Sequence, residues 1–198
     1  MTSRQRTEAF SDGIFAVAAT LLVLDLKVPQ IAGDLGGALL KQWPAYAAYA
    51  VSFLTIGIIW VNHHRIFDRL RSVDRPLQFL NLLLLMTVAA IPFGTSLLSA
   101  YLQRPTGHED RIAAAAYGAI MTLMGVGFAA INFYIARSRH LLHDPTRWSR
   151  AGQIRFLAPG VPLYSAAILL SLLDARLALV VYGLLAVFYA FLPILERE

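Results

Sequence analysis

Long apolar runs separated by short polar segments dominate the pattern along the chain. Six runs are bounded by charged or turn residues, at about Phe10–Leu26, Ala38–Val61, Leu77–Tyr101, Ile112–Ile135, Phe156–Leu173 and Leu177–Leu195. A helix that crosses a bilayer needs about 20 mostly apolar residues. The pattern therefore predicts an all-α membrane protein with six transmembrane helices. The connections are short, so residues 1–198 are expected to form a single transmembrane domain.

Composition agrees with this prediction. The chain is 58% hydrophobic and only 15% charged, and its mean hydropathy is +0.59. These values lie outside the range typical of soluble domains. The net charge of +5 does not point to nucleic acid, because the basic residues fall between apolar runs rather than on one amphipathic face. The absence of cysteine excludes disulfides, thiolate metal sites and cysteine nucleophiles.

The distribution of lysine and arginine predicts the orientation of the chain. If the N-terminus is cytoplasmic, twelve of the 17 basic residues lie in inside segments and five in outside segments. Cytoplasmic loops of membrane proteins carry the excess of positive charge. We therefore expect a multi-pass protein of a cell (inner) membrane with both termini in the cytoplasm.

The first run differs from the other five in its polar residues. It carries Ser11 and Asp12 near its start, Thr20 inside it and Asp25 near its end, whereas the later runs have no ionisable residue near their centres. An ionisable residue inside a membrane segment is costly and is a candidate for function. The first run is therefore the expected functional element.

Polar residues of the next two runs are expected near Asp12, because the end of the second run and the start of the third lie on the same side. They are Trp60, Asn62, His63, His64, Arg65 and Asn81. A histidine or arginine of the second run would neutralise Asp12. This group either only holds three helix ends together or also sets the position of a pore helix, and the two interpretations are compatible.

His63 and His64 do not predict a metal site. Adjacent helical residues point about 100° apart, so the pair does not chelate one ion as an i, i+4 pair would. The sequence also lacks a His-Glu-x-x-His motif, a Gly-x-Ser-x-Gly motif and a phosphate loop. We expect no metal site, no cofactor and no enzyme activity.

An apolar stripe runs along the first helix. Val17, Leu21 and Leu24 follow the i, i+4, i+7 spacing of one helix face, and Thr20 flanks them. Such a stripe on a membrane helix is more often packed or lipid-facing than pore-lining. Periodicity alone therefore does not reveal a pore.

Two ordered segments carry a family resemblance. The first is Arg6-Thr-Glu-Ala-Phe10-Ser11-Asp12 and its continuation to Asp25, and the second runs from Ser52 through Trp60-Val-Asn-His63-His64-Arg65 to Phe67. The first segment matches an Arg-x-x-x-Phe-Ser-Asp signature. Both segments resemble the transmembrane protein 175 family, which comprises the bacterial and endosomal/lysosomal potassium channels. About the first half of the chain carries the resemblance.

The resemblance implies six helices per subunit, a homotetramer, and a central pore lined by four copies of the first helix. Positions carried over after the Phe-Ser-Asp motif place apolar constrictions at Val17, Leu21 and Leu24 and a threonine layer at Thr20. The implied partners are three further copies of the chain, the bilayer and permeant potassium ions. Val17 is smaller than the isoleucine that is common at its position in relatives.

An apolar ring closes a pore because water and hydrated ions leave a narrow hydrophobic neck. The chain has no Thr-Val-Gly-Tyr-Gly filter, so potassium selectivity would come from the cost of partial dehydration, with help from the Thr20 hydroxyls. We therefore expect a modestly potassium-selective cation channel. Asp25, repeated four times at the outer mouth, would concentrate cations there, or it would pair with Lys27 or Lys41.

Other function classes stay open at this point. The main alternative is a small carrier or a proton-conducting protein whose pathway lies inside each subunit. A structural membrane subunit without transport activity is more distant.

Overall fold

The described part of the chain is helical. The structure, a computed structural model, describes residues 4–30, 33–103, 108–144 and 160–195. Within these ranges the only β-pairing is an isolated bridge between Leu70 and Leu142. The elements are α1 Arg4–Leu21, η1 Leu22–Asp25, α2 Leu35–Lys41, α3 Trp43–Asp68, α4 Arg75–Leu102, α5 Glu109–Arg137, η2 Arg139–Leu141, α7 Gly160–Ser171 and α8 Ala175–Leu195, where η marks a short 3₁₀ helix.

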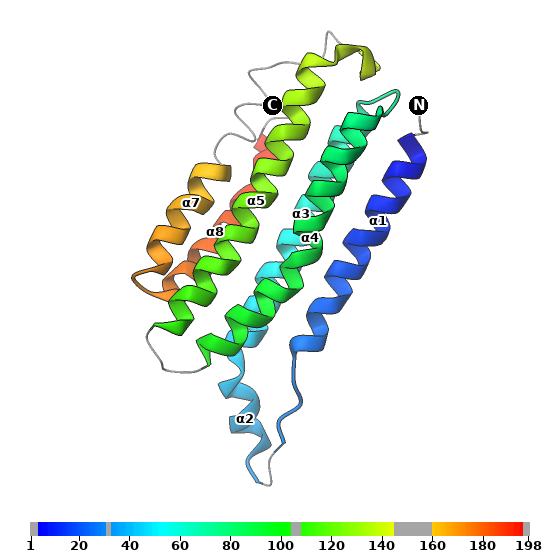
Figure 1. The fold of residues 1–198 in the computed structure, drawn as a ribbon. Helices are drawn as coiled ribbons and strands as arrows, with labels where there is room; N and C mark the ends of the chain where they lie inside the picture. The colour runs from blue at the N-terminus through cyan, green and yellow to red at the C-terminus, as the bar shows by residue number, and fades with distance from the viewer. Residues whose placement is uncertain (1–3, 31–32, 104–107, 145–159, 196–198) are drawn as a thin grey trace.

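The long helices lie side by side in one elongated bundle (Figure 1). α4 packs against α5 in the middle, and α7 and α8 pack on α5. α1 lies at the opposite edge, where it packs against α3 and α4. One side of α1 is therefore covered by α3 and α4, and the described residues leave the other side uncovered.

Four helical segments are long and apolar enough to cross a membrane. They are Arg4–Asp25, Trp43–Asp68, Arg75–Leu102 and Glu109–Arg137. α7 has 12 residues, which span about 18 Å at 1.5 Å per residue, and the apolar part of α8 whose side chains are described is Ala175–Tyr189. The start of the fifth predicted run, residues 156–159, lies outside the described residues. An all-helical membrane protein is confirmed, and the count of six spans stays a prediction.

The second predicted run is not one continuous helix. α2 covers Leu35–Lys41 and is capped at its start by Asp34, whose Oδ1 accepts a hydrogen bond from the Gly37 amide at 2.9 Å. α3 begins only at Trp43 with Pro44 in its first turn. Proline lacks an amide hydrogen and clashes with a preceding helical turn, so it begins a helix instead of continuing one. α3 also continues past Val61 to Asp68, because hydropathy marks the apolar length and not the helix end.

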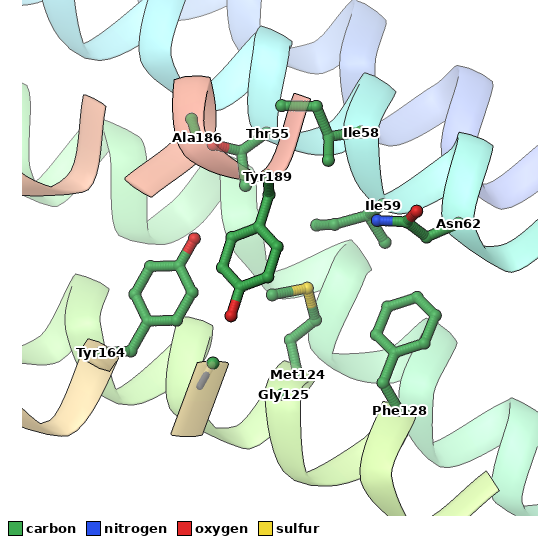
Figure 2. Close-up of a pocket in the computed structure, with 11 residues that line it drawn as sticks. Thr55, Ile58, Ile59, Asn62, Met124, Gly125, Phe128, Tyr164, Ala186 and Tyr189 are labelled. Carbon is green, nitrogen blue, oxygen red and sulfur yellow. The ribbon is translucent and has the colours of Figure 1, made fainter. Parts of the chain in front are cut away.

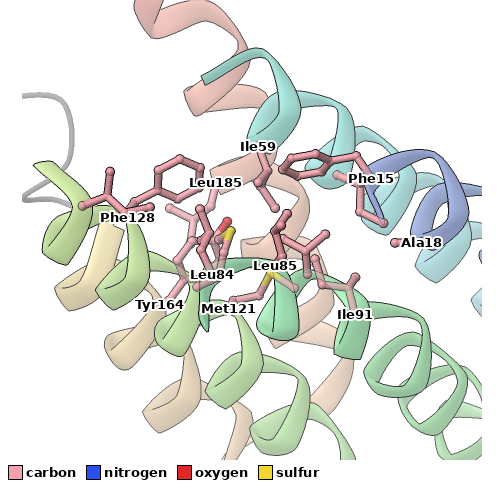
Figure 3. Packing of buried hydrophobic residues seen from close by; sticks show 14 of the residues in the cluster. Phe15, Ala18, Ile59, Leu84, Leu85, Ile91, Met121, Phe128, Tyr164 and Leu185 are labelled. Carbon is pink, nitrogen blue, oxygen red and sulfur yellow. The ribbon is translucent and has the colours of Figure 1, made fainter. Parts of the chain in front are cut away.

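Buried apolar side chains fill the centre of the bundle (Figure 3). Leu84 and Leu85 of α4, Met121 of α5 and Ile59 of α3 are buried there, and Phe15 brings α1 into contact with the same cluster. A chain of hydroxyls ties the core helices together. Thr95 donates a hydrogen bond to Ser52 Oγ at 2.7 Å, and Ser52 Oγ lies 3.1 Å from the Tyr117 hydroxyl.

One end of the bundle is closed by backbone hydrogen bonds. The Arg71 amide donates to the Leu141 carbonyl at 2.9 Å, and the His143 amide donates to the Arg69 carbonyl at 3.0 Å. The turn between α3 and α4 is thereby joined to the segment that follows α5. Asp74 adds a second link, since it caps α4 and accepts a hydrogen bond from the Tyr134 hydroxyl at 2.6 Å.

Basic residues gather at this same end. α1 begins, α3 ends, α4 begins and both α5 and α8 end there (Figure 1). The described basic residues at this end are Arg4, Arg6, Arg65, Arg69, Arg71, Arg75, Arg137 and Arg139. Those at the other end are Lys27, Lys41, Arg111 and Arg176. The asymmetry used to predict the orientation therefore matches the geometry of the described helices.

The turn between α7 and α8 lies at the less basic end. Asp174 Oδ1 accepts hydrogen bonds from the Leu177 amide at 2.9 Å and from the Arg176 amide at 2.7 Å. These bonds stabilise the charged carboxylate, so the Leu177 amide and then the Arg176 amide lower the pKa of Asp174 from its ordinary value. Asp174 thus fixes the start of α8.

Candidate functional site

The inner face of α1 is buried against α3 and α4. Ser11, Phe15 and Ala18 are buried, and Leu22 continues this face into the 3₁₀ segment. Helical residues three, four and seven apart share a face, so these positions form a strip that packs on the subunit. The rotation of α1 about its own axis is thereby fixed.

The opposite face of α1 is uncovered by the described chain. Val17 is 55% exposed, Leu21 43% and Leu24 73%, so the predicted apolar stripe points away from the rest of the described bundle. Leu24 lies in the 3₁₀ segment that follows Leu21. Residues three apart eclipse each other in a 3₁₀ helix, so the stripe continues in line beyond the α-helical part.

Thr20 lies on this outward face. Its hydroxyl is the donor in contacts with two backbone oxygens, those of Ala16 at 2.9 Å and Val17 at 3.0 Å. A hydroxyl that donates its hydrogen to the backbone keeps lone pairs for an outside donor or a cation. Thr20 is therefore exposed as an acceptor.

A buried polar network joins α1, α3 and α4 at the basic end. Asn81 of α4 donates through Nδ2 to Ser11 Oγ at 3.0 Å, and Asn81 Oδ1 lies 2.8 Å from His63 Nε2. Ser11 in turn donates to the Thr7 carbonyl at 2.8 Å. The side chains of Ser11, His63 and Asn81 are all buried. Asn81 is the shared partner, so its removal would take one hydrogen bond from Ser11 and one from His63, and a buried polar group without a partner is destabilising.

Aromatic contacts enclose His63. Its ring makes an edge contact with Phe15 of α1, with centroids 5.3 Å apart, and stacks on Phe67 at 4.2 Å. The histidine therefore connects the inner face of α1 to α3 by packing as well as by hydrogen bonding.

Within the described residues, Asp12 binds a tryptophan and forms no ion pair. The indole nitrogen of Trp60 donates to Asp12 Oδ1 at 2.8 Å, and the Trp60 ring stacks on His64 with centroids 6.1 Å apart. The prediction that a histidine or arginine of α3 neutralises Asp12 is therefore wrong in its partner. Along α3, Trp60 lies a turn from His64 on the same side, and its indole reaches the carboxylate first.

An ion-pair cluster lies next to this network, and of its four members only His64 was predicted from the sequence, whereas Arg4, Glu8 and Asp68 were not. Arg4 binds Glu8 Oε2 and Asp68 Oδ1, each at 2.9 Å, and also donates to the carbonyls of Asp68 at 3.1 Å and Leu70 at 3.2 Å. His64 Nε2 lies 3.2 Å from Asp68 Oδ2. Two i, i+4 pairs, Arg4 with Glu8 and His64 with Asp68, were the available signal.

Glu8, His64 and Asp68 each bring one possible metal-ligand atom to within 4.8 Å of the others. The guanidinium of Arg4 already contacts both carboxylates, so the described cluster is held together by a protein cation. The expectation of no metal site stays a prediction.

The remaining predicted residues lie outside these networks. Arg6 and Phe10 are exposed on α1, at the spacing that continues the outward face of Val17. Arg65 on α3 forms no ion pair within the described ranges. Asp25 is partly buried at the far end of α1 and pairs with neither Lys27 nor Lys41, both of which the structure describes.

Comparisons with known proteins identify the family. A family model described as endosomal/lysosomal potassium channel TMEM175 matches residues 6–92. A potassium channel of Streptomyces collinus is 48% identical over 208 residues, which cover 100% of this chain and 98% of that protein. The endosomal/lysosomal proton channel TMEM175 of Homo sapiens is 37% identical over 120 residues, which cover 56% of this chain and 24% of the human protein.

A solved structure shares the fold. The crystal structure of a lysosomal potassium-selective channel TMEM175 homolog from Chamaesiphon minutus matches with a TM-score of 0.84 and 38% sequence identity, covering 95% of this chain and 96% of that chain. The bundle and the two faces of α1 thus belong to a membrane ion channel and not to an enzyme. This chain belongs to the TMEM175 family of endosomal/lysosomal potassium channels, and the resemblance of its first half is confirmed.

Proposed function

We propose that the chain is one subunit of a homotetrameric, potassium-permeable cation channel with six transmembrane helices and a central pore lined by α1. One observation carries this proposal. The face of α1 that holds Arg6, Phe10, Val17, Leu21 and Leu24 is exposed, whereas the opposite face is fully packed by the same subunit. The names of the relatives in Streptomyces and Chamaesiphon support potassium as the permeant ion.

Two small or polar residues favour contact with further copies over contact with lipid. Gly13 lies on the outward face, and a Cβ added there would meet nothing within 4 Å. Small residues on membrane helices allow another helix to approach closely. Thr20, on the same face, offers acceptor lone pairs that lipid tails cannot use. Four copies of α1 around an axis would use both features.

In such a tetramer the conduction path would close at apolar rings. Val17, Leu21 and Leu24 would form successive constrictions from which water and hydrated ions withdraw. Thr20 hydroxyls between these rings would replace part of the water lost by a passing cation. Since hydroxyl oxygens replace only part of the hydration shell, we expect modest preference for potassium over sodium.

The buried network would hold the pore helix in register. Ser11, Asn81 and His63 fix one end of α1, and Asp12 bound to Trp60 fixes the adjoining side. Asp25 would lie at the other mouth, where four carboxylates would attract cations. The basic end that holds both chain termini would face the cytoplasm of a cell (inner) membrane.

Potassium flux into liposomes tests the pore. Leu21→Ser places a hydroxyl in the constriction and is expected to raise the flux, because a polar ring holds water in the neck. The matched control is Leu83→Ser on α4, a leucine that is 55% exposed away from α1, and its flux should equal that of the parent. Equal flux in parent and Leu21→Ser would contradict the pore assignment.

The assembly and the permeant ion are tested separately. Light scattering of the purified protein in detergent is expected to give the mass of four subunits, and a monomer that conducts would favour a pathway inside each subunit. A pH-sensitive dye in the same liposomes measures proton flux, the alternative suggested by the human relative's name. Proton flux without potassium flux would show that protons, and not potassium ions, pass through the protein.

A further inference from the structure

Arg6 is a charged residue on the outward face of α1. It precedes Val17 by 11 residues, and 11 residues make about three turns of an α-helix, so the two side chains leave the helix in nearly the same direction. Phe10 lies between them on this face and is 54% exposed, and Arg6 is exposed as well. The strip that holds the predicted constrictions therefore ends in a positive charge at the basic end of the bundle.

The ion pairs at this end of α1 leave Arg6 out. Arg4 binds Glu8 and Asp68, so that cluster brings one positive and two negative charges and adds no net positive charge. Arg6 forms no ion pair and no hydrogen bond within the described ranges. Its guanidinium is therefore not compensated by a carboxylate of the described chain.

Asp12 is the next charge along α1 on the way from Arg6 to the constrictions. It lies six residues beyond Arg6, which is about 9 Å along the axis and a rotation of about 120° away from the direction of Arg6. Asp12 is turned toward α3, where it accepts a hydrogen bond from the Trp60 indole. A cation that approaches α1 from the basic end therefore meets Arg6 before Asp12.

The cavity inside the subunit is a poor alternative route for a cation. It is enclosed by α3, α5, α7 and α8, has a volume of about 60 Å³ and is lined by uncharged residues. The ring of Tyr189 lies across it, between Tyr164 and Asn62 (Figure 2). A cation without a charged partner is costly to bury. The outward face of α1, which begins at Arg6, is therefore the favoured route.

Distance and salt determine how far the charge of Arg6 acts. Arg6 is about 16 Å from Val17 along the helix, at 1.5 Å per residue. Charges are screened beyond about 30 Å at 0.01 M salt, but already beyond about 3 Å at 1 M salt. Low-dielectric walls such as an apolar neck focus the field along the passage. Arg6 therefore acts as far as the first constriction at low salt and only at the mouth at high salt.

We propose that Arg6 makes conduction directional. In the tetrameric pore proposed above, on which this inference rests, four copies of Arg6 form a positive ring at the cytoplasmic mouth. The ring lowers the concentration of potassium that enters from the cytoplasm, whereas potassium that enters from the other side meets the ring only as it leaves. Asp25, near the opposite end of α1, has the opposite charge and adds to the same asymmetry. Outward potassium current is therefore weaker than inward current at low salt.

Single-channel currents in membrane patches test this role of Arg6. The full-length protein is recorded with the same potassium chloride solution on both sides, at about 0.01 M and then at about 1 M. In the parent we expect inward current to exceed outward current about two- to threefold at low salt and to approach it at high salt. Arg6→Gln should raise the low-salt outward current about twofold, and Arg6→Glu should raise it further.

Two control variants separate the charge of Arg6 from other effects. Arg6→Lys keeps the charge and changes the shape of the side chain, so its currents should equal those of the parent. Arg137→Gln removes a charge at the same end of the bundle. Arg137 lies on α5 with its guanidinium carbon 4.4 Å from the ring centroid of Phe133, and α4 packs between α5 and α1. The currents of this variant should also equal those of the parent.

The negative results differ in what they contradict. A parent without potassium current would remove the proposed pore itself. A conducting parent whose low-salt currents match those of Arg6→Gln and Arg6→Glu would overturn this inference and leave the pore intact. The inference would also be wrong if the effect of Arg6→Gln persisted undiminished at about 1 M salt. A smaller assembly of Arg6→Gln in light scattering would mean that Arg6 pairs with a neighbouring copy, which contradicts an uncompensated ring.

Discussion

The two faces of α1 differ in what holds them. The inner face carries Ser11 and Phe15 and is completed within the subunit by Asn81 and His63. The outer face carries Val17 and Leu24, and the described chain leaves both exposed. Polar residues thus anchor the helix, whereas apolar residues are presented outward. The comparison teaches that stability and conduction should respond to substitutions on different sides of one helix.

Removal of the central asparagine should have the largest effect on stability. Asn81→Leu removes one hydrogen bond from Ser11, which keeps its bond to the Thr7 carbonyl, and one from His63. A buried polar group left without a partner costs about 1–3 kcal/mol. We expect a loss of about 2–4 kcal/mol in the free energy of unfolding, measured by chemical denaturation in detergent. Asn62→Leu is the matched control, because that amide has no hydrogen-bond partner in the part of the chain that the structure describes, and it should change stability by less than about 1 kcal/mol. Similar losses in both variants would break the distinction.

The hydrogen bond between Asp12 and Trp60 should contribute less to stability than the bonds of Asn81, because it lies at an exposed edge of the contact between α1 and α3. Trp60→Phe removes the donor, and Asp12→Ala removes the acceptor. A double-mutant cycle is expected to give a coupling energy of about 1–2 kcal/mol. Asp12→Asn keeps an acceptor oxygen and should retain most of the stability and the tetramer yield. A coupling near zero would mean that the bond does not position α1.

The ion pairs of Arg4 should contribute less to the free energy of unfolding than the bond between Asp12 and Trp60. Arg4→Gln removes its charge. The partner Asp68 is 48% exposed, and exposed pairs contribute about 0–1 kcal/mol, whereas the Glu8 side chain is only 13% exposed. We therefore expect a loss of about 1 kcal/mol. The loss should shrink further at high salt. Arg6→Gln, an exposed arginine two residues away, serves as the control for folding of the subunit. A salt-independent loss above about 2 kcal/mol would show a stronger anchor than the geometry indicates.

The smallest effect on stability is expected on the outer face. Thr20→Val should change the free energy of unfolding by no more than about 0.5 kcal/mol, since the side chain contacts only its own helix. The potassium-to-sodium permeability ratio, measured as a reversal potential under bi-ionic conditions, should fall about two- to threefold as the hydroxyl layer is lost. An unchanged ratio would remove Thr20 from the selectivity argument.

The sequence predicted the helices because hydropathy and helical spacing are local properties. The stripe of Val17, Leu21 and Leu24 followed from periodicity alone, and its exposure agrees with one shared face. The proximity of Ser11, His63 and Asn81 followed from the expected side of each helix end. These features need only the direction of each helix and its residue spacing.

Other features depend on the rotation of each of three helices about its own axis relative to the other two. The spacing of residues along the sequence does not determine these relative rotations. Asp12 meets Trp60 instead of His64 or Arg65 because of the rotation of α3. Arg4 reaches Asp68 because α1 begins beyond its apolar run, where hydropathy gives no signal. The split between α2 and α3 depends on Pro44 in the first turn of α3, and a hydropathy pattern does not register such a break.

The backbone bonds between the α3–α4 turn and the segment after α5 have a mechanical consequence. Arg4 grips the carbonyl of Leu70 in that turn, and Leu70 is bridged to Leu142 just beyond α5. The first residue of α1 in the structure is therefore only two links from the end of α5. A displacement of the segment after α5 would therefore reach the base of α1 through this joint, in addition to the packing of α4 between α5 and α1.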